Sequence, residues 1–76
     1  LTKGLHHTDY RVRRAAAEVI GVVSDPRAAA DLVAALKSES DDFVKSGINR
    51  ALQAISGRSI ESHQVEQWEE WLKTQK

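Results

Sequence analysis

The chain has 76 residues, in which eleven basic side chains balance eleven acidic ones, and it has no cysteine. This length allows one small domain that buries only ~60% of its unfolded surface, and the missing cysteine excludes a disulfide framework or a thiolate metal site. Zero net charge gives no long-range attraction for nucleic acid or an anionic membrane, and no apolar run approaches the ~20 residues that span a bilayer. The absence of cysteine and of a recognisable signal peptide favours a cytoplasmic location.

A segment near the start of the chain recurs further along, which predicts stacked helical repeats. A shift of thirty-two residues places Val12 on Val44 and Asp9 on Asp41. Abundant alanine, a single proline and apolar residues at helical spacing favour an all-α fold over any sheet. We therefore expect an α-solenoid of about two helical hairpins, within one domain that spans residues 1–76.

Residues 1–7 are predicted to be the remnant of a helix from a preceding repeat, because Leu1 and Leu5 have the spacing of a leucine pair further along. Gly4 weakens such a helix by roughly 1 kcal/mol relative to alanine, so this end should fray. Self-association through an open amino-terminal end is a further prediction. The residues expected to face missing neighbours there are Leu1, Leu5, Val12 and Ala16.

The first complete helix is expected over residues 9–23. The carboxylate of Asp9 can accept hydrogen bonds from the free amides at its start. The helix should end at Ser24, after which Asp25 can cap the next helix and Pro26 suits its first position. Six apolar residues form one continuous stripe along it, of the kind that packs on a neighbour. They are Val12, Ala15, Ala16, Val19, Ile20 and Val23.

The second helix is expected over about Pro26–Ser38 and should run antiparallel to the first, because the turn between them is short. Ala29, Leu32 and Leu36 belong to its predicted buried stripe. The opposite side would be exposed, and together with one residue of the last helix it forms the candidate partner-binding face. The face consists of Arg27, Asp31, Ala34, Lys37, Ser38 and Trp71.

The third helix, about 42–56, repeats the first, with Asp41 as its cap and Gly57 as the left-handed residue that ends it. Gly47 should be a weak point within it. Its inward residues are predicted to be Val44, Ile48, Leu52 and Ile55.

The last helix, about 63–74, follows a longer loop and carries two tryptophans. Inserting four residues aligns it with the second helix, so we expect it to be the second helix of the final repeat. Trp68 lies on its apolar stripe and should be buried, whereas Trp71 lies at the edge of that stripe. A charged outer side suits a helix that caps the stack, since a terminal repeat needs one polar face.

The run from Val12 to Ile55 resembles the short HEAT-like repeats first described in phycobilisome lyases. The matching features are the pair Val12-Arg13, the Asp-Pro-Arg-Ala turn at 25–28, and two leucines four residues apart. The resemblance implies that residues 9–38 and 41–74 are two repeats at the carboxyl-terminal section of an α-solenoid. It also implies bridges between basic residues and acidic turn residues of adjacent repeats. The residues implied are Arg13 and Lys45, with Asp9, Asp25 and Asp41 as partners.

The predicted function is a non-catalytic protein–protein interaction or scaffold module. No nucleophile is paired with a base and no glycine loop could cradle phosphate, so we predict no catalytic residue, cofactor site or metal site and no enzyme activity. His6 and His7 lack further ligands at metal spacing, and exposure at a chain end explains them better. Two alternatives remain open, a terminal part of a nucleic-acid-binding HEAT array and a bilin lyase-type subunit. Nucleic acid is disfavoured because the cluster Arg11, Arg13 and Arg14 is local and matched by acidic residues.

Overall fold

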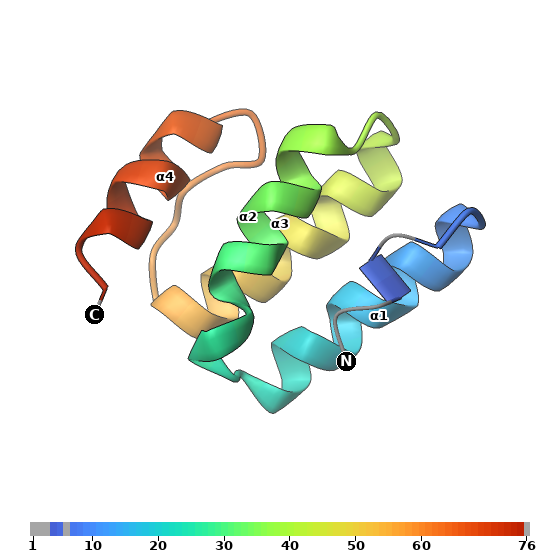
Figure 1. Ribbon diagram of the computed structural model, residues 1–76, viewed down its shortest axis with the longest axis horizontal. Helices are drawn as coiled ribbons and strands as arrows, with labels where there is room; N and C mark the ends of the chain where they lie inside the picture. Colours follow the sequence, from blue (N-terminus) through green and yellow to red (C-terminus); the bar gives the residue numbers. More distant parts are fainter. Residues whose placement is uncertain (1–3, 6, 76) are drawn as a thin grey trace.

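The computed structural model describes residues 4, 5 and 7–75, and these contain only helices, turns and loops (Figure 1). The α-helices are α1 (Tyr10–Val23), α2 (Ala29–Ser38), α3 (Asp42–Ser56) and α4 (Val65–Lys73), and a 3-10 turn, η2 (Pro26–Ala28), leads into α2. The all-α prediction is confirmed, and a helix with two tryptophans closes the carboxyl end. The predicted remnant helix falls largely on residues 1–3 and 6, which lie outside the described residues.

The helix ends follow the chemistry predicted from the sequence. The side chain of Asp9 accepts a hydrogen bond from the amide of the residue two positions on, and Asp25 and Asp41 do the same at the next two helix starts. Each carboxylate thereby satisfies an amide that has no partner within its helix. Ser24 ends α1 and Gly57 ends α3, both in the left-handed region with φ of 55° and 71°. Local signals therefore place three helix starts and two helix ends.

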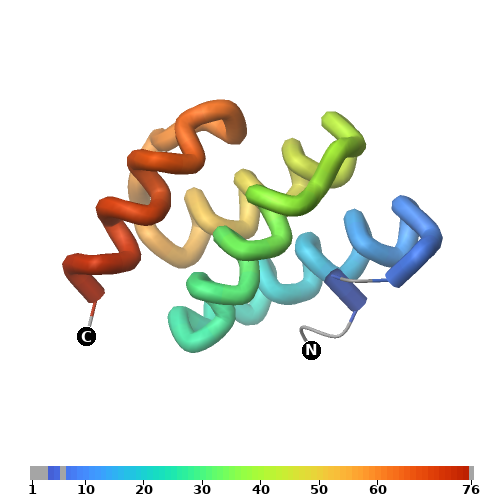
Figure 2. The backbone as a smooth tube through the Cα atoms, turned by 45° about the horizontal axis from the view of Figure 1, so that its top comes forward, coloured from blue at the N-terminus to red at the C-terminus, as the bar shows by residue number. Residues whose placement is uncertain are grey.

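Two layers of helices enclose the core. The helices α1 and α3 lie side by side and run in the same direction, α2 lies over α3, and α4 lies beside α2 (Figures 1 and 2). Apolar side chains from all four helices meet between the layers, where their burial stabilises the fold. The largest fully buried side chains are Trp68, Ile20, Leu32, Leu36, Ile48, Leu52 and Val44.

The last helix runs in the opposite direction to the one predicted. Trp71 and Gln75, near the end of α4, line the same recess as Pro26 at the start of η2 and Ile55 at the end of α3. The helix α4 is therefore antiparallel to α2 and parallel to α3 (Figure 1). The alignment of α4 with the second helix predicted that α4 runs antiparallel to α3, and this is wrong. The loop 57–64 is long enough for the chain to return along α3 before α4 begins.

Only part of the apolar stripe predicted for α1 packs against the rest of the domain. Ile20 is fully buried, and Gly21, which is outside the predicted stripe, lies close to α3: an added Cβ there would lie 3.0 Å from Cα of Ala51. The small residues Gly21 and Ala51 let the two helices approach closely, while four members of the stripe remain exposed. The exposed members of the stripe are Val12 (38% exposed), Ala15, Val19 (49%) and Val23 (55%).

The described residues before α1 pack on the domain. Leu5 is only 2% exposed and belongs to the core, so the prediction that it faces a missing neighbour is wrong. Gly4 lies so close to α1 that an added Cβ would lie 2.7 Å from Cβ of Ala16. The missing side chain thus allows this segment to lie against α1.

Candidate protein-interaction surfaces

The predicted partner-binding side of α2 is exposed. We call it the α2 face and define it as Arg27, Asp31, Ala34, Lys37 and Ser38, all of which are exposed to solvent. The small side chain of Ala34 lies in the middle of this face. Arg27 and Lys37, at its two ends, each already pair with a carboxylate. The guanidinium of Arg27 donates to the carboxylate of Asp25 at 2.9 Å, and Nζ of Lys37 lies 3.2 Å from Oε2 of Glu69. The α2 face therefore combines two small side chains, Ala34 and Ser38, with two paired cations and the exposed carboxylate of Asp31.

Trp71, the sixth residue of the predicted partner-binding face, is not exposed to solvent. It is 9% exposed, and its ring meets the ring of Trp68 edge to face, with centroids 5.8 Å apart and planes at 81°. This is a favourable aromatic geometry. The structure thus places Trp71 in the core below the α2 face, and its inclusion among the exposed binding residues is wrong.

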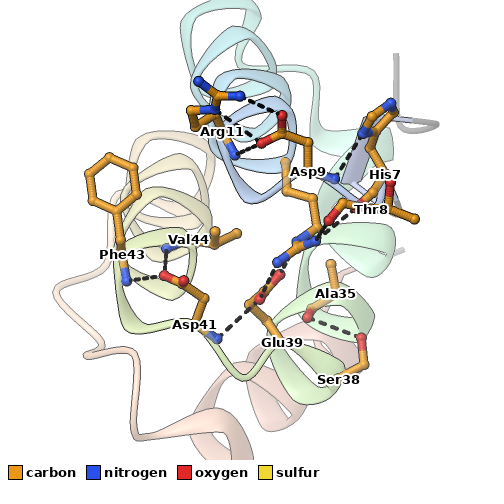
Figure 3. Close-up of polar contacts among 11 residues, drawn as sticks. His7, Thr8, Asp9, Arg11, Ala35, Ser38, Glu39, Asp41, Phe43 and Val44 are labelled. Atoms are coloured by element: carbon orange, nitrogen blue, oxygen red, sulfur yellow. Dashed lines mark hydrogen bonds and ion pairs between the residues drawn. The ribbon is translucent and has the colours of Figure 1, made fainter.

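Arg13 makes the main polar bridge of the domain, but not with a predicted partner. Its Nε donates to Oε1 of Glu39 at 2.7 Å and its Nη2 to Oε2 at 3.1 Å. The carboxylate of Glu39 also accepts the amide of Asp41 at 3.1 Å (Figure 3). The side chain of Glu39 is 6% exposed, and that of Arg13 is 19% exposed. The pair joins α1 to the turn between α2 and α3.

The three aspartates that were predicted to bridge adjacent repeats bind groups close to them in the sequence instead. Asp9 pairs with Arg11 at 2.9 Å, and the hydrogen bond from that side chain, with further help from the Arg11 amide, lowers the pKa of Asp9 to about 2. Asp25 pairs with Arg27, whose side-chain hydrogen bond likewise lowers the pKa of Asp25. Asp41 is occupied by the amides at the start of α3. Among the described residues Lys45 makes no ion pair, so its predicted bridge is not formed there.

Arg14 crosses between α1 and α3 over a glycine. Its Nε donates to Glu18 at 2.8 Å, and its guanidinium carbon lies 4.3 Å above the centroid of the Phe43 ring, a cation–π arrangement. A Cβ on Gly47 would lie 2.4 Å from Cδ of Arg14. The predicted weak point in α3 is thus the space through which Arg14 passes.

The basic cluster is therefore committed to the protein's own carboxylates. Arg11 pairs with Asp9, Arg13 with a buried glutamate, and Arg14 with Glu18. Phosphate would have to displace these carboxylates in order to bind the cluster.

A second exposed surface was not recognised as a site in the sequence. We call it the α1 face; it runs along the exposed side of α1, and Val22 at its edge lines a recess with Gly47 and Ala51 of α3. Val22 is its most exposed residue, at 86%, and apolar side chains continue along the helix beside it. Their helical spacing was visible in the sequence, but that spacing predicted burial. The α1 face consists of Val12, Ala15, Val19, Val22 and Val23.

A buried polar network closes the other side of the stack. The indole N–H of Trp68 donates to Oδ1 of Asn49 at 2.7 Å, and Nδ2 of Asn49 donates to the carbonyl of Ile60 at 3.0 Å. Gln53 donates to the same carbonyl at 3.1 Å. Every polar atom of Asn49 is thereby satisfied within the core. The loop 57–64 is held against α3 by this network.

Metal and membrane sites were sought in the part of the chain that the structure describes. It contains no cluster of three or more histidine, cysteine, aspartate or glutamate side chains that could hold a metal ion. Nδ1 of His7 accepts the amide of Asp9 at 3.0 Å, and His6 lies outside the described residues. Within the same residues no helix is long and apolar enough to cross a membrane.

A family model of HEAT repeats matches residues 1–53. The chain belongs to the HEAT-repeat family. The HEAT match covers α1, α2 and most of α3 and stops before the loop and α4, where the direction of the chain departs from a repeated hairpin. No curated protein and no solved structure gave a significant match. HEAT repeats generally mediate protein–protein interaction or scaffolding, and HEAT proteins are typically non-catalytic.

Proposed function

We propose that this chain is a non-catalytic interaction module that binds another protein through the α2 face. The observation that carries this proposal is the exposure of all five residues of that face along η2 and α2. Solenoid repeats present such helices as a continuous binding surface. Arg27 and Lys37 already pair with carboxylates of this chain, so a partner meets the small side chains of Ala34 and Ser38 and the exposed carboxylate of Asp31.

The repeat division is part of the proposal. Residues 9–38 form one hairpin of α1 and α2, and residues 41–74 begin a second unit with α3 and end it with α4 as the closing helix. The four helices share one core, which supports a single domain over residues 1–76. A reducing compartment such as the cytoplasm suits a chain without cysteine.

A substitution at the centre of the α2 face tests the proposal. Ala34→Arg places a long charged side chain where the partner would approach, without touching the core. Ser59→Arg, in the exposed loop before α4, adds the same charge elsewhere and serves as the control. Proteins cross-linked to the wild-type chain and identified by mass spectrometry should be lost with Ala34→Arg and retained with Ser59→Arg. Equal recovery with both variants, each with an unchanged circular dichroism spectrum, would refute binding through this face.

A further inference from the structure

Trp71 lines two recesses at the end of α4, although it is only 9% exposed. The first recess lies between the start of η2 and the ends of α3 and α4, and the second lies between α4 and the loop 57–64. Their volumes are about 330 Å³ and about 310 Å³, at the lower end of the range for sites that bind small ligands. Each therefore suits a side chain rather than a whole helix.

The first recess is mainly apolar. Pro26 and Ile55 line it together with Trp71. Pro26 is exposed and Ile55 is half-buried, so a side chain that enters would cover apolar surface that now faces solvent. The polar residues of its wall are Arg27 and Gln75, and no carboxylate is among the described residues that line it. The first recess can therefore take a large apolar side chain.

An arginine lies at each recess. The side chain of Arg27 at the first recess is 90% exposed, and it uses Nε and Nη2 for Asp25, whereas its Nη1 makes no hydrogen bond within the described residues. Arg58 lines the second recess and makes no ion pair in the same part of the chain. Glu70 also lines the second recess, but Oε1 of Glu70 lies 3.6 Å from Nζ of Lys73. A carboxylate from outside could therefore pair with Arg58.

We propose that the two recesses bind a linear acidic segment of a partner protein, whose leucine or phenylalanine side chain enters the first recess while a neighbouring carboxylate pairs with Arg58. This inference rests on the proposed function and specifies the chemistry of its partner, because Arg27 belongs both to the α2 face and to the first recess. The charges determine the sign of the partner, since a basic segment would meet two guanidinium groups and gain only Glu70, which Lys73 already pairs. Large side chains that fill such pockets carry much of the binding energy at protein interfaces.

Titration with short peptides tests the inference. The test peptide is acetyl-Asp-Glu-Phe-Asp-Glu-amide, and NMR follows the indole N–H of Trp71 and the methyl groups of Ile55. Both signals should shift and reach saturation. A control peptide with alanine in place of phenylalanine should bind at least ~10-fold more weakly, because it buries no large apolar side chain. A control with asparagine and glutamine in place of the acidic residues should bind about 2–5-fold more weakly, the effect of an exposed ion pair. No saturable shift, or equal binding of the three peptides, would overturn the proposal.

Two arginine variants locate the carboxylate of the peptide. Arg58→Gln should weaken binding of the test peptide about 2–5-fold. Arg50→Gln is the matched control, because Arg50 is also exposed and lines a separate recess between α1 and α3. Neither substitution removes an ion pair seen within the described residues, so both variants should keep the wild-type Tm. Equal affinity of the two variants would overturn the pairing with Arg58.

The cross-linking experiment separates this inference from the proposed function. Partners that are lost with Ala34→Arg but kept with Arg58→Gln, together with no peptide binding, would leave the α2 face in place and overturn the acidic segment. Peptide binding in a chain whose Ala34→Arg variant keeps its partners would support the recesses and refute the α2 face. Sedimentation that reveals a dimer, which the test peptide dissociates, would assign the recesses to a second copy of this chain and also overturn the proposal.

Discussion

The indole N–H of Trp68 and Oδ1 of Asn49 form a 2.7 Å hydrogen bond inside the core, at a point where both residues are at most 5% exposed. The bond joins α4 to α3, and Asn49 passes the connection on to the loop through the carbonyl of Ile60. The buried side-chain amide of Asn49 thus binds both α4 and the loop before it, whose path determines the direction of α4.

Trp68→Phe should destabilise the domain by more than the smaller ring alone would explain. It leaves Oδ1 of Asn49 buried without a donor, which costs about 1–3 kcal/mol, in addition to the lost apolar contact. Urea unfolding followed by circular dichroism measures the change. Trp71→Phe keeps an aromatic ring beside the same core and removes no hydrogen bond to Asn49, so it should cost clearly less. Equal losses for the two variants would mean that the Trp68–Asn49 bond contributes little.

Glu39→Gln should weaken the junction between α1 and the turn before α3. The glutamate is nearly buried and accepts two hydrogen bonds from Arg13 and one from the amide of Asp41. Loss of its charge should cost about 1.5–3 kcal/mol, the range for hydrogen bonds to charged groups. Arg11→Gln removes an exposed pair and should cost at most ~1 kcal/mol. Thermal unfolding of both variants compares them, and the reverse order would contradict a structural role for the Arg13–Glu39 pair.

Local signals in the sequence were sufficient to predict three helix starts and two helix ends. An aspartate before a helix, a proline at its first position and a glycine after it each act through groups a few residues away. That is why the starts of α1 and α3 follow directly from Asp9 and Asp41. The buried stripe of α2 was equally predictable, because the large apolar residues Leu32, Val33 and Leu36 all lie on one side of that helix.

Features that depend on distant pairs were not predictable in the same way. The close approach of Gly21 to Ala51 joins positions thirty residues apart, and the valine pattern does not reveal it. Arg13 pairs with Glu39 because the predicted aspartates already serve helix caps and nearby arginines. The direction of α4 depends on the path of the loop, and its length permitted either direction. For the candidate sites, exposure on the α2 face was predicted but the α1 face was not.

The loss of stability at acid pH should depend on Asp9. Its pKa falls from an unfolded value of ~3.9 to about 2 in the folded chain, because Arg11 donates hydrogen bonds to it. A depressed folded pKa adds stability that is complete above the unfolded pKa and is lost as pH falls towards 2. Asp9→Asn should therefore flatten the fall in Tm between about pH 4 and pH 2. Asp42→Asn, at an exposed neighbouring helix start, is the control, and an equal flattening there would argue against the Asp9–Arg11 contact as the cause.

Gly47→Ala should be harmful in the wild-type chain and beneficial once Arg14 is shortened. Alanine favours a helix over glycine by about 1 kcal/mol, but its Cβ would lie 2.4 Å from Cδ of Arg14 and force that side chain from its contacts with Glu18 and Phe43. In an Arg14→Ala background the space is empty, so Gly47→Ala should stabilise by about 1 kcal/mol. A double-mutant cycle from urea unfolding gives the coupling between the two positions directly. Additive effects would show that Arg14 does not occupy the space over Gly47.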